Sequence, residues 1–197
     1  ESVKDEITVR IVYEGRAAKV ALEQSELDKI ETYYEEAAEA GANPHQIEKS
    51  KQATATMHSI LGNPNRLRIV AEDFVRHYEN RIQEGSTVRG KAIFVASSRP
   101  IAFALYQLIV ALRPDWAVAQ YSPTEMQLTE DQRQKKQPME QLRVLMTRGK
   151  DDLPEMYELA GNSAYRKKLE GEFKREDSNF KIAIVVDMWL TGFDVPF

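Results

Sequence analysis

Two carboxylates and a glycine follow an apolar segment near the end of the chain. Residues 180–196 read FKIAIVVDMWLTGFDVP, so a continuous apolar run leads directly into Asp187, and Thr191, Gly192 and Asp194 come after a short connector. In open parallel sheets, ligands gather where strands end, and glycine lets a ligand approach the backbone closely. The pattern indicates a binding site at a strand end. Carboxylates in such places can also simply cap turns and helix starts.

A second stretch, GSTVRGKA at residues 85–92, matches the phosphate-binding pattern G-x-x-x-x-G-K but ends in Ala92 where Ser or Thr is needed. Such a loop must follow a strand and open a helix, so that backbone N–H groups surround the phosphates. Here the expected order is reversed, because Gly85 follows a helix and Lys91 enters a strand. We therefore interpret the stretch as a helix end and a turn, and expect no phosphate loop in this chain.

Hydroxyls and a guanidinium follow another apolar run, KAIFVA at residues 91–96. Ser97, Ser98 and Arg99 are suited to contact with a phosphate backbone, which positions a protein on nucleic acid without reading its sequence. Ser98 could equally be the N-cap of a helix that has Pro100 in its first turn. The two roles can coexist.

The elements that must position these residues form two groups. The sequence predicts a strand over residues 7–13 and helices over 25–40 and 44–61. A third helix should run from Pro64 to Gly85, because Leu67, Val70, Phe74, Tyr78 and Ile82 recur at three- and four-residue steps.

From there the pattern is that of a parallel α/β domain. Strands buried on both faces are expected at 91–96 and 181–186, since both runs are apolar without alternation. A helix at 101–112 and a strand at 116–122 would complete a βαβ unit. We expect a polar loop region over 122–147, then a helix within 153–170 that is broken at Gly161.

Composition narrows the possible functions. The 197 residues carry 27 Lys and Arg against 31 Asp and Glu, a net charge of −4, so contact with nucleic acid must use a local basic surface. There is no cysteine, which excludes disulfides, thiolate metal sites and cysteine nucleophiles. The three histidines, His45, His58 and His77, have no ligand spacing, so no metal site is assigned. We expect no membrane association and a cytoplasmic location.

The segment around Asp187 resembles motif V of superfamily 2 helicases and translocases, with Asp187, Gly192 and Asp194 in the spacing D-x-x-x-x-G-x-D. The sequence LTGFD-x-P at residues 190–196 closely resembles that of the motor (R) subunit of type I restriction enzymes. KAIFVASSRPIAFALYQ resembles motif IV at the start of the second RecA-like core. RLRIVAEDFVRHYENR resembles the helix before that core, and TVRIVYEGR the strand that leaves the first core.

The resemblance implies an α/β fold with a RecA-like parallel sheet flanked by helices, preceded by a strand and a helical linker. Residues 1–62 would lead out of the first motor lobe, and residues 63–197 would be the second. It also implies an ATP-dependent DNA translocase and nuclease, with ATP and Mg²⁺ bound mainly by the first lobe. Double-stranded DNA and the modification and specificity subunits would be its partners.

Since the chain lacks an initial Met and stops after a strand-like run, we expect a fragment without a complete catalytic site, inactive alone. By resemblance, Asp187, Thr191, Gly192 and Asp194 would form the nucleotide-binding motif V, with Gly192 and Asp194 facing the nucleotide or the cleft and Asp194 near the ribose. Thr191 would lie close to DNA phosphate or couple the two sites. Two alternatives remain open: a lobe of another superfamily 2 helicase or translocase, and a non-catalytic interaction module.

Overall fold

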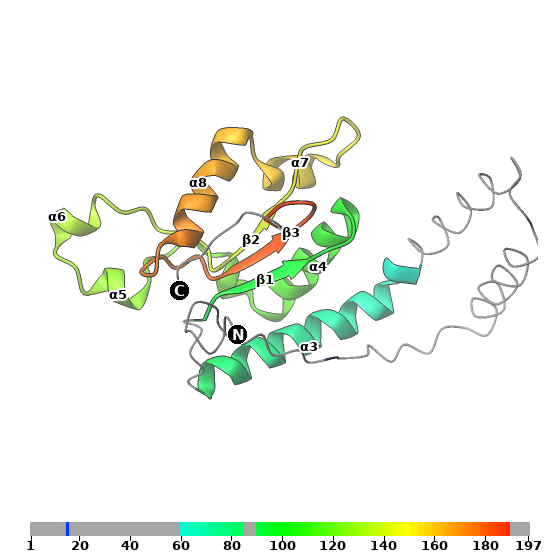
Figure 1. Ribbon diagram of the computed structural model, residues 1–197, viewed down its shortest axis with the longest axis horizontal. Helices are drawn as coiled ribbons and strands as arrows, with labels where there is room; N and C mark the ends of the chain where they lie inside the picture. Colours follow the sequence, from blue (N-terminus) through cyan, green and yellow to red (C-terminus); the bar gives the residue numbers. More distant parts are fainter. Residues whose placement is uncertain (1–14, 16–59, 85–89, 190–197) are drawn as a thin grey trace, which may run out of the picture.

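Three parallel strands form the centre of the domain (Figure 1). The computed structural model describes Gly15 and residues 60–84 and 90–189; most of the expected segment 1–62 lies outside these residues. The strands are β1 (Ala92–Val95), β2 (Leu142–Leu145) and β3 (Ile182–Val185), in the order β1-β3-β2. Ala92 and Leu142 both pair with Ile182, so the three strands start and end level with one another.

The two faces of the sheet are covered by different helices, which gives three layers (Figure 1). Every β3 side chain is buried, which confirms the prediction for 181–186. The prediction for 91–96 was wrong in one respect, because Ile93 and Val95 are 40% and 54% exposed. These two side chains share a face with Ala183 and Val185, which α8 (Ser163–Lys174) covers, and α8 does not reach as far as β1.

The opposite face of the sheet packs against α3 (Pro64–Gln83) and α4 (Arg99–Leu112). Asn63 caps α3 by accepting hydrogen bonds from the backbone N–H groups of the second and third helical residues, at 3.0 and 3.2 Å. The predicted stripe is confirmed for Leu67 and Tyr78, which are buried, and for Val70 and Phe74, which are partly buried against the core. It was wrong for Ile82, which is 49% exposed. Tyr78 meets the Trp116 ring edge to face, with 5.4 Å between ring centroids.

The segment after α4 differs most from the sequence-based expectation. Residues 116–122 are not a strand: Pro114–Ala117 form a 3-10 turn (η1), and Gln120 makes only an isolated antiparallel bridge with Met139. Proline at the first position favours a helical turn. Trp116 and Ser122, at the two ends of this run, are buried, whereas Val118 is 56% exposed. The second strand of the βαβ unit is instead β2, in the region expected to be a loop.

Two short helices, α5 (Pro123–Met126) and α6 (Glu130–Arg133), form an excursion between η1 and β2. The buried Glu125 anchors the segment that contains α5 and α6 to the rest of the domain, because its carboxylate accepts from the Arg175 guanidinium at 2.6 Å. Lys136 forms a second tie with Asp177, at 2.8 Å. Both ties lie toward the amino ends of the strands.

The predicted break at Gly161 is confirmed. Helix α7 (Pro154–Ala160) ends there and α8 begins two residues later. Gly161 has φ +60°, and an added Cβ would lie 2.1 Å from the ring of Tyr165, so glycine is required at this turn. No helix within the described residues is long and apolar enough to cross a membrane.

Candidate functional site

The carboxyl ends of all three strands meet at one edge of the sheet, and each is followed by a polar residue. Ser97 and Ser98 follow β1, Thr147 follows β2, and Asp187 follows β3. These four residues line one cavity of about 370 Å³. Its other lining residues are Arg99, Pro100, Val186 and Met188. The topology thus brings together the sequence-predicted residues that the structure describes, and it adds Thr147.

Asp187 lies exposed at the strand end, where the sequence predicted it, and has φ +52°. Trp189, two residues on, has φ +60°. They are the two non-glycine residues with positive φ in the described part of the chain, and such conformations cost about 1–3 kcal/mol each. The ring of Trp189 packs on Phe173 of α8, with centroids 5.2 Å apart. Burial of this ring helps to offset the strain in the turn.

Ser98 precedes α4 and is its N-cap residue, as one of the two interpretations predicted. Its carbonyl accepts from the backbone N–H of Ala102 at 2.9 Å, but its hydroxyl makes no capping hydrogen bond. Because the hydroxyl is not used to cap the helix, it can serve a ligand in the cavity. The start of α4 adds the partial positive charge of a helix N-terminus.

Arg99 has a partner within the protein. Its guanidinium lies 2.7 Å from the Asp152 carboxylate, whose side chain is only 2% exposed, and donates to the Thr147 carbonyl at 3.2 Å. Asp152 also accepts from the backbone N–H of Gly149 at 2.6 Å. Arg99 therefore fastens the loop after β2 to the start of α4, and much of its charge is balanced within the protein.

The described carboxyl edge does not form a site for a divalent cation. Asp187 supplies the one carboxylate among the residues that line the cavity. No group of three or more His, Cys, Asp or Glu side chains that could hold a metal occurs in residues 60–84 and 90–189. Thr191, Gly192 and Asp194 lie outside the described residues, so their expected roles stay predictions. The hydroxyls of Ser97, Ser98 and Thr147 can donate to an anionic oxygen, whereas the Asp187 carboxylate can only accept, and the described edge lacks a ligand set for Mg²⁺.

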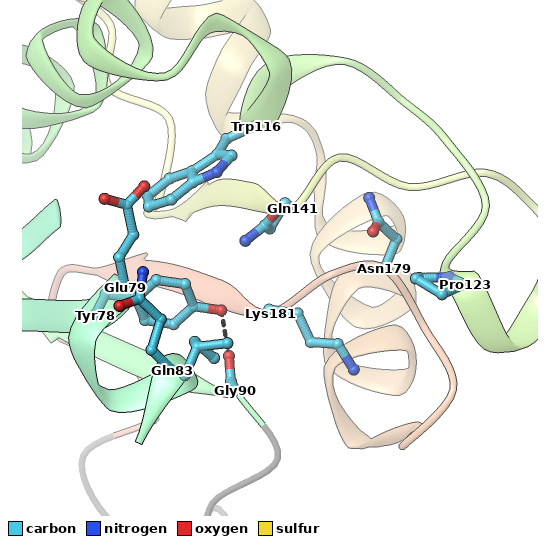
Figure 2. Close-up of a pocket in the computed structure, with 10 residues that line it drawn as sticks. Tyr78, Glu79, Gln83, Gly90, Trp116, Pro123, Gln141, Asn179 and Lys181 are labelled. Carbon is cyan, nitrogen blue, oxygen red and sulfur yellow. Dashed lines mark hydrogen bonds between the residues drawn. The ribbon is translucent and has the colours of Figure 1, made fainter. Parts of the chain in front are cut away.

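A larger cavity, about 600 Å³, lies at the opposite edge of the sheet (Figure 2). Tyr78 lines it and donates its hydroxyl hydrogen to the Gly90 carbonyl, while Trp116 and Gln141 lie across from it. Burial raises the pKa of Tyr78 to about 12, although a hydrogen bond with Gln141 opposes the shift. Burial also lowers the pKa of Lys181. None of the sequence-predicted site residues lies here.

Lys91 also lies near this amino edge. Its ammonium group donates to the carbonyls of Phe173 and, at 2.9 Å, Arg175, so it binds the end of α8. Burial, together with the nearby charges of Lys181 and Arg175, lowers its pKa to about 8. Residues 85–89 of the stretch GSTVRGKA lie outside the described residues, so its interpretation as a helix end and a turn stays a prediction.

Thr147 is the functional candidate that sequence reasoning missed. The run LRVLM at residues 142–146 is apolar apart from Arg143 and resembles the runs that gave the other two strands. Its position inside a long polar region hid this signal. Arg143 is accommodated because it stacks against Tyr165, 5.6 Å from the ring centroid, and pairs with Glu140 at 2.6 Å.

Comparison with known proteins identifies relatives of the whole chain. Residues 88–197 match the family described as type I restriction enzyme subunit R domain 3. The chain is 30% identical over 196 residues to the type I restriction enzyme HindI endonuclease subunit of Haemophilus influenzae. It is 31% identical over 195 residues to a Methanocaldococcus jannaschii chain with the provisional name of type I restriction enzyme MjaIXP endonuclease subunit.

These matches cover 100% and 96% of the chain but 16% of each relative, so the chain spans about one-sixth of the length of the curated relatives it matches. No solved structure matches it. The three-stranded parallel sheet flanked by helices is consistent with a RecA-like fold. On the family match over more than half of its residues, the chain belongs to the family of type I restriction enzyme R subunits.

Proposed function

We propose that this chain is the second RecA-like lobe of a subunit that moves DNA at the expense of ATP and belongs to a DNA-cleaving restriction complex. The observation that carries the proposal is the common edge at which three parallel strands present Ser97, Ser98, Thr147 and Asp187 around one cavity. In open parallel sheets this edge is where ligands bind. In a family of restriction enzyme subunits, the fitting ligand is the phosphate backbone of double-stranded DNA.

Hydroxyl groups at a helix N-terminus suit such a contact for a physical reason. A motor must hold any sequence equally well, and phosphate contacts carry no base information. Ser97 and Ser98 offer hydroxyls beside the first turn of α4, and Thr147 offers a third from the loop after β2. The sequence motif that resembles motif V would then connect this edge to the nucleotide through Asp187 and the residues that follow it.

ATP and Mg²⁺ would be bound mainly by another lobe. The sequence contains no complete phosphate loop, and the described edge lacks a Mg²⁺ ligand set. The chain by itself should therefore show neither ATPase nor nuclease activity. The proposal includes modification and specificity subunits as partners of the complex, and a cytoplasmic location where those partners and DNA are found.

The test is binding of the chain to short duplexes of unrelated sequence across a salt series. We expect weak binding that is independent of sequence and that falls steeply as salt rises. A non-catalytic interaction module would show no such binding. Robust ATP turnover by the purified chain that disappears in Asp194→Ala would contradict the assignment of ATP to another lobe.

A further inference from the structure

Arg148 has a different environment from Arg99, although both lie at the carboxyl edge. Its guanidinium carbon lies 4.0 Å from the centroid of the Tyr157 ring, and its Nε donates to the Tyr157 carbonyl at 3.0 Å. Tyr157 belongs to α7 and is 41% exposed. The Tyr157 ring stacks against the guanidinium carbon and the Tyr157 carbonyl accepts from Nε, so together they fix the plane of the guanidinium.

The two terminal nitrogens of Arg148 are left for a ligand. In the part of the chain that the structure describes, Arg148 forms no ion pair with a carboxylate. Arg99, in contrast, is bound to the buried Asp152. Arg148 directly follows Thr147, which lines the cavity with Ser97 and Ser98. A guanidinium without a carboxylate partner among the described residues therefore lies one residue beyond Thr147, which lines the cavity.

A guanidinium held in this way matches the phosphate group of a nucleic acid. Its terminal N–H groups can donate two parallel hydrogen bonds to two phosphate oxygens. The stack on an aromatic ring fixes the side chain before binding, so less rotamer entropy is lost when the ligand arrives. An exposed lysine would supply the same charge without this fixed geometry.

We propose that Arg148, stacked on Tyr157, binds a DNA backbone phosphate at the carboxyl edge, whereas Arg99 positions the loop that carries Arg148. The inference rests on the proposed function, since it names a binding residue for the same DNA site. It assigns the phosphate contact to a residue that the sequence pattern did not single out. Tyr157 is a positioning residue in this scheme and makes no contact with DNA itself.

The experiment measures binding of a fluorescent 20-base-pair duplex by anisotropy from 50 to 200 mM salt. Loss of one phosphate contact should reduce the slope of log Kobs against log salt by about 0.9 in Arg148→Ala. At low salt we expect about tenfold weaker binding. The control, Arg76→Ala, removes the same charge from an exposed site on α3 and should leave the slope unchanged.

Substitutions at Tyr157 separate positioning from charge. Tyr157→Phe keeps the ring and the backbone carbonyl and should bind DNA as the unsubstituted chain does. Tyr157→Ala keeps the net charge but removes the ring, and we expect a several-fold loss of affinity. Arg148→Lys keeps the charge without the planar group, so its affinity should fall between those of the unsubstituted chain and Arg148→Ala; it also provides the measurement if Arg148→Ala fails to fold.

The outcomes are distinguishable. Salt-dependent binding with an unchanged slope in Arg148→Ala would overturn this inference and leave the proposed function standing. If the slope of log Kobs against log salt fell in Arg99→Ala and not in Arg148→Ala, Arg99 would be the residue that contacts the phosphate. If Arg148→Ala weakened ATP binding and not DNA binding, the phosphate would be that of a nucleotide. Absence of DNA binding by the unsubstituted chain would overturn both proposals.

Discussion

Removal of either member of the Arg99–Asp152 ion pair should destabilise the chain, and removal of the arginine should cost more. The Asp152 side chain is 2% exposed, whereas that of Arg99 is 32% exposed. In Arg99→Ala a carboxylate remains buried without its cation, which typically costs about 3–5 kcal/mol. In Asp152→Ala the guanidinium can turn to water, so we expect about 1–2 kcal/mol, mostly from the lost hydrogen bonds of Arg99 and the Gly149 N–H.

Urea unfolding followed by circular dichroism measures both free energies of unfolding. The double variant should be more stable than Arg99→Ala, because it removes the isolated carboxylate. The exposed Arg68–Glu72 pair on α3 is the control, with side chains 56% and 45% exposed, and either single alanine variant there should change stability by less than about 0.5 kcal/mol. An Asp152→Ala variant that loses as much stability as Arg99→Ala would refute this reasoning.

Three further predictions concern the same fold. Gly149→Ala should lower the free energy of unfolding by about 1–3 kcal/mol, because the new Cβ would lie 2.2 Å from Nη2 of the fixed Arg99. Gly171→Ala, where the helix surface is open, should raise the free energy of unfolding by about 0.5–1 kcal/mol. Urea unfolding of both variants tests the difference. Asp187→Gly should raise the free energy of unfolding by about 1 kcal/mol through relief of the positive φ; a lower free energy of unfolding would contradict the strain. The folded-state pKa of Tyr78, about 12, lies above its ordinary value of 10.0, so the unfolded chain loses this proton first and stability should fall as pH rises from 10 to 12. In Tyr78→Phe the free energy of unfolding, measured by urea unfolding at pH 10 and pH 12, should fall by about 2 kcal/mol less than in the unsubstituted chain. The same fall in both chains would argue against the raised pKa of Tyr78.

The sequence predicted secondary structure best for the strand whose side chains are all buried. The run at residues 181–186 became β3, and its end placed Asp187 correctly, because a strand in the middle of a sheet must be apolar on both faces. The same rule failed for β1, an edge strand whose Ile93 and Val95 remain partly exposed. An apolar run alone does not reveal which of its faces a neighbouring helix will cover.

The residues that make up the candidate site were harder to predict than its position at the carboxyl edge of the sheet. Thr147 was missed together with β2, because a charged side chain interrupts that strand and polar sequence surrounds it. The partner of Arg99 lies 53 positions away along the chain, and only the packed loop after β2 brings Asp152 to it. The same holds for Arg148, since sequence spacing does not show that the Tyr157 ring lies beneath its guanidinium.

The strand order has a consequence for synthesis of the chain. In the described sheet, β1 and β2 both pair with β3 and neither pairs with the other. Because β3 is the last of the three to be made, the described partner of both earlier strands is missing from a nascent chain on the ribosome until residues 182–185 emerge. The helices can form in the meantime, whereas the described three-stranded sheet and the cavity at its carboxyl edge can be completed only after β3 has been made.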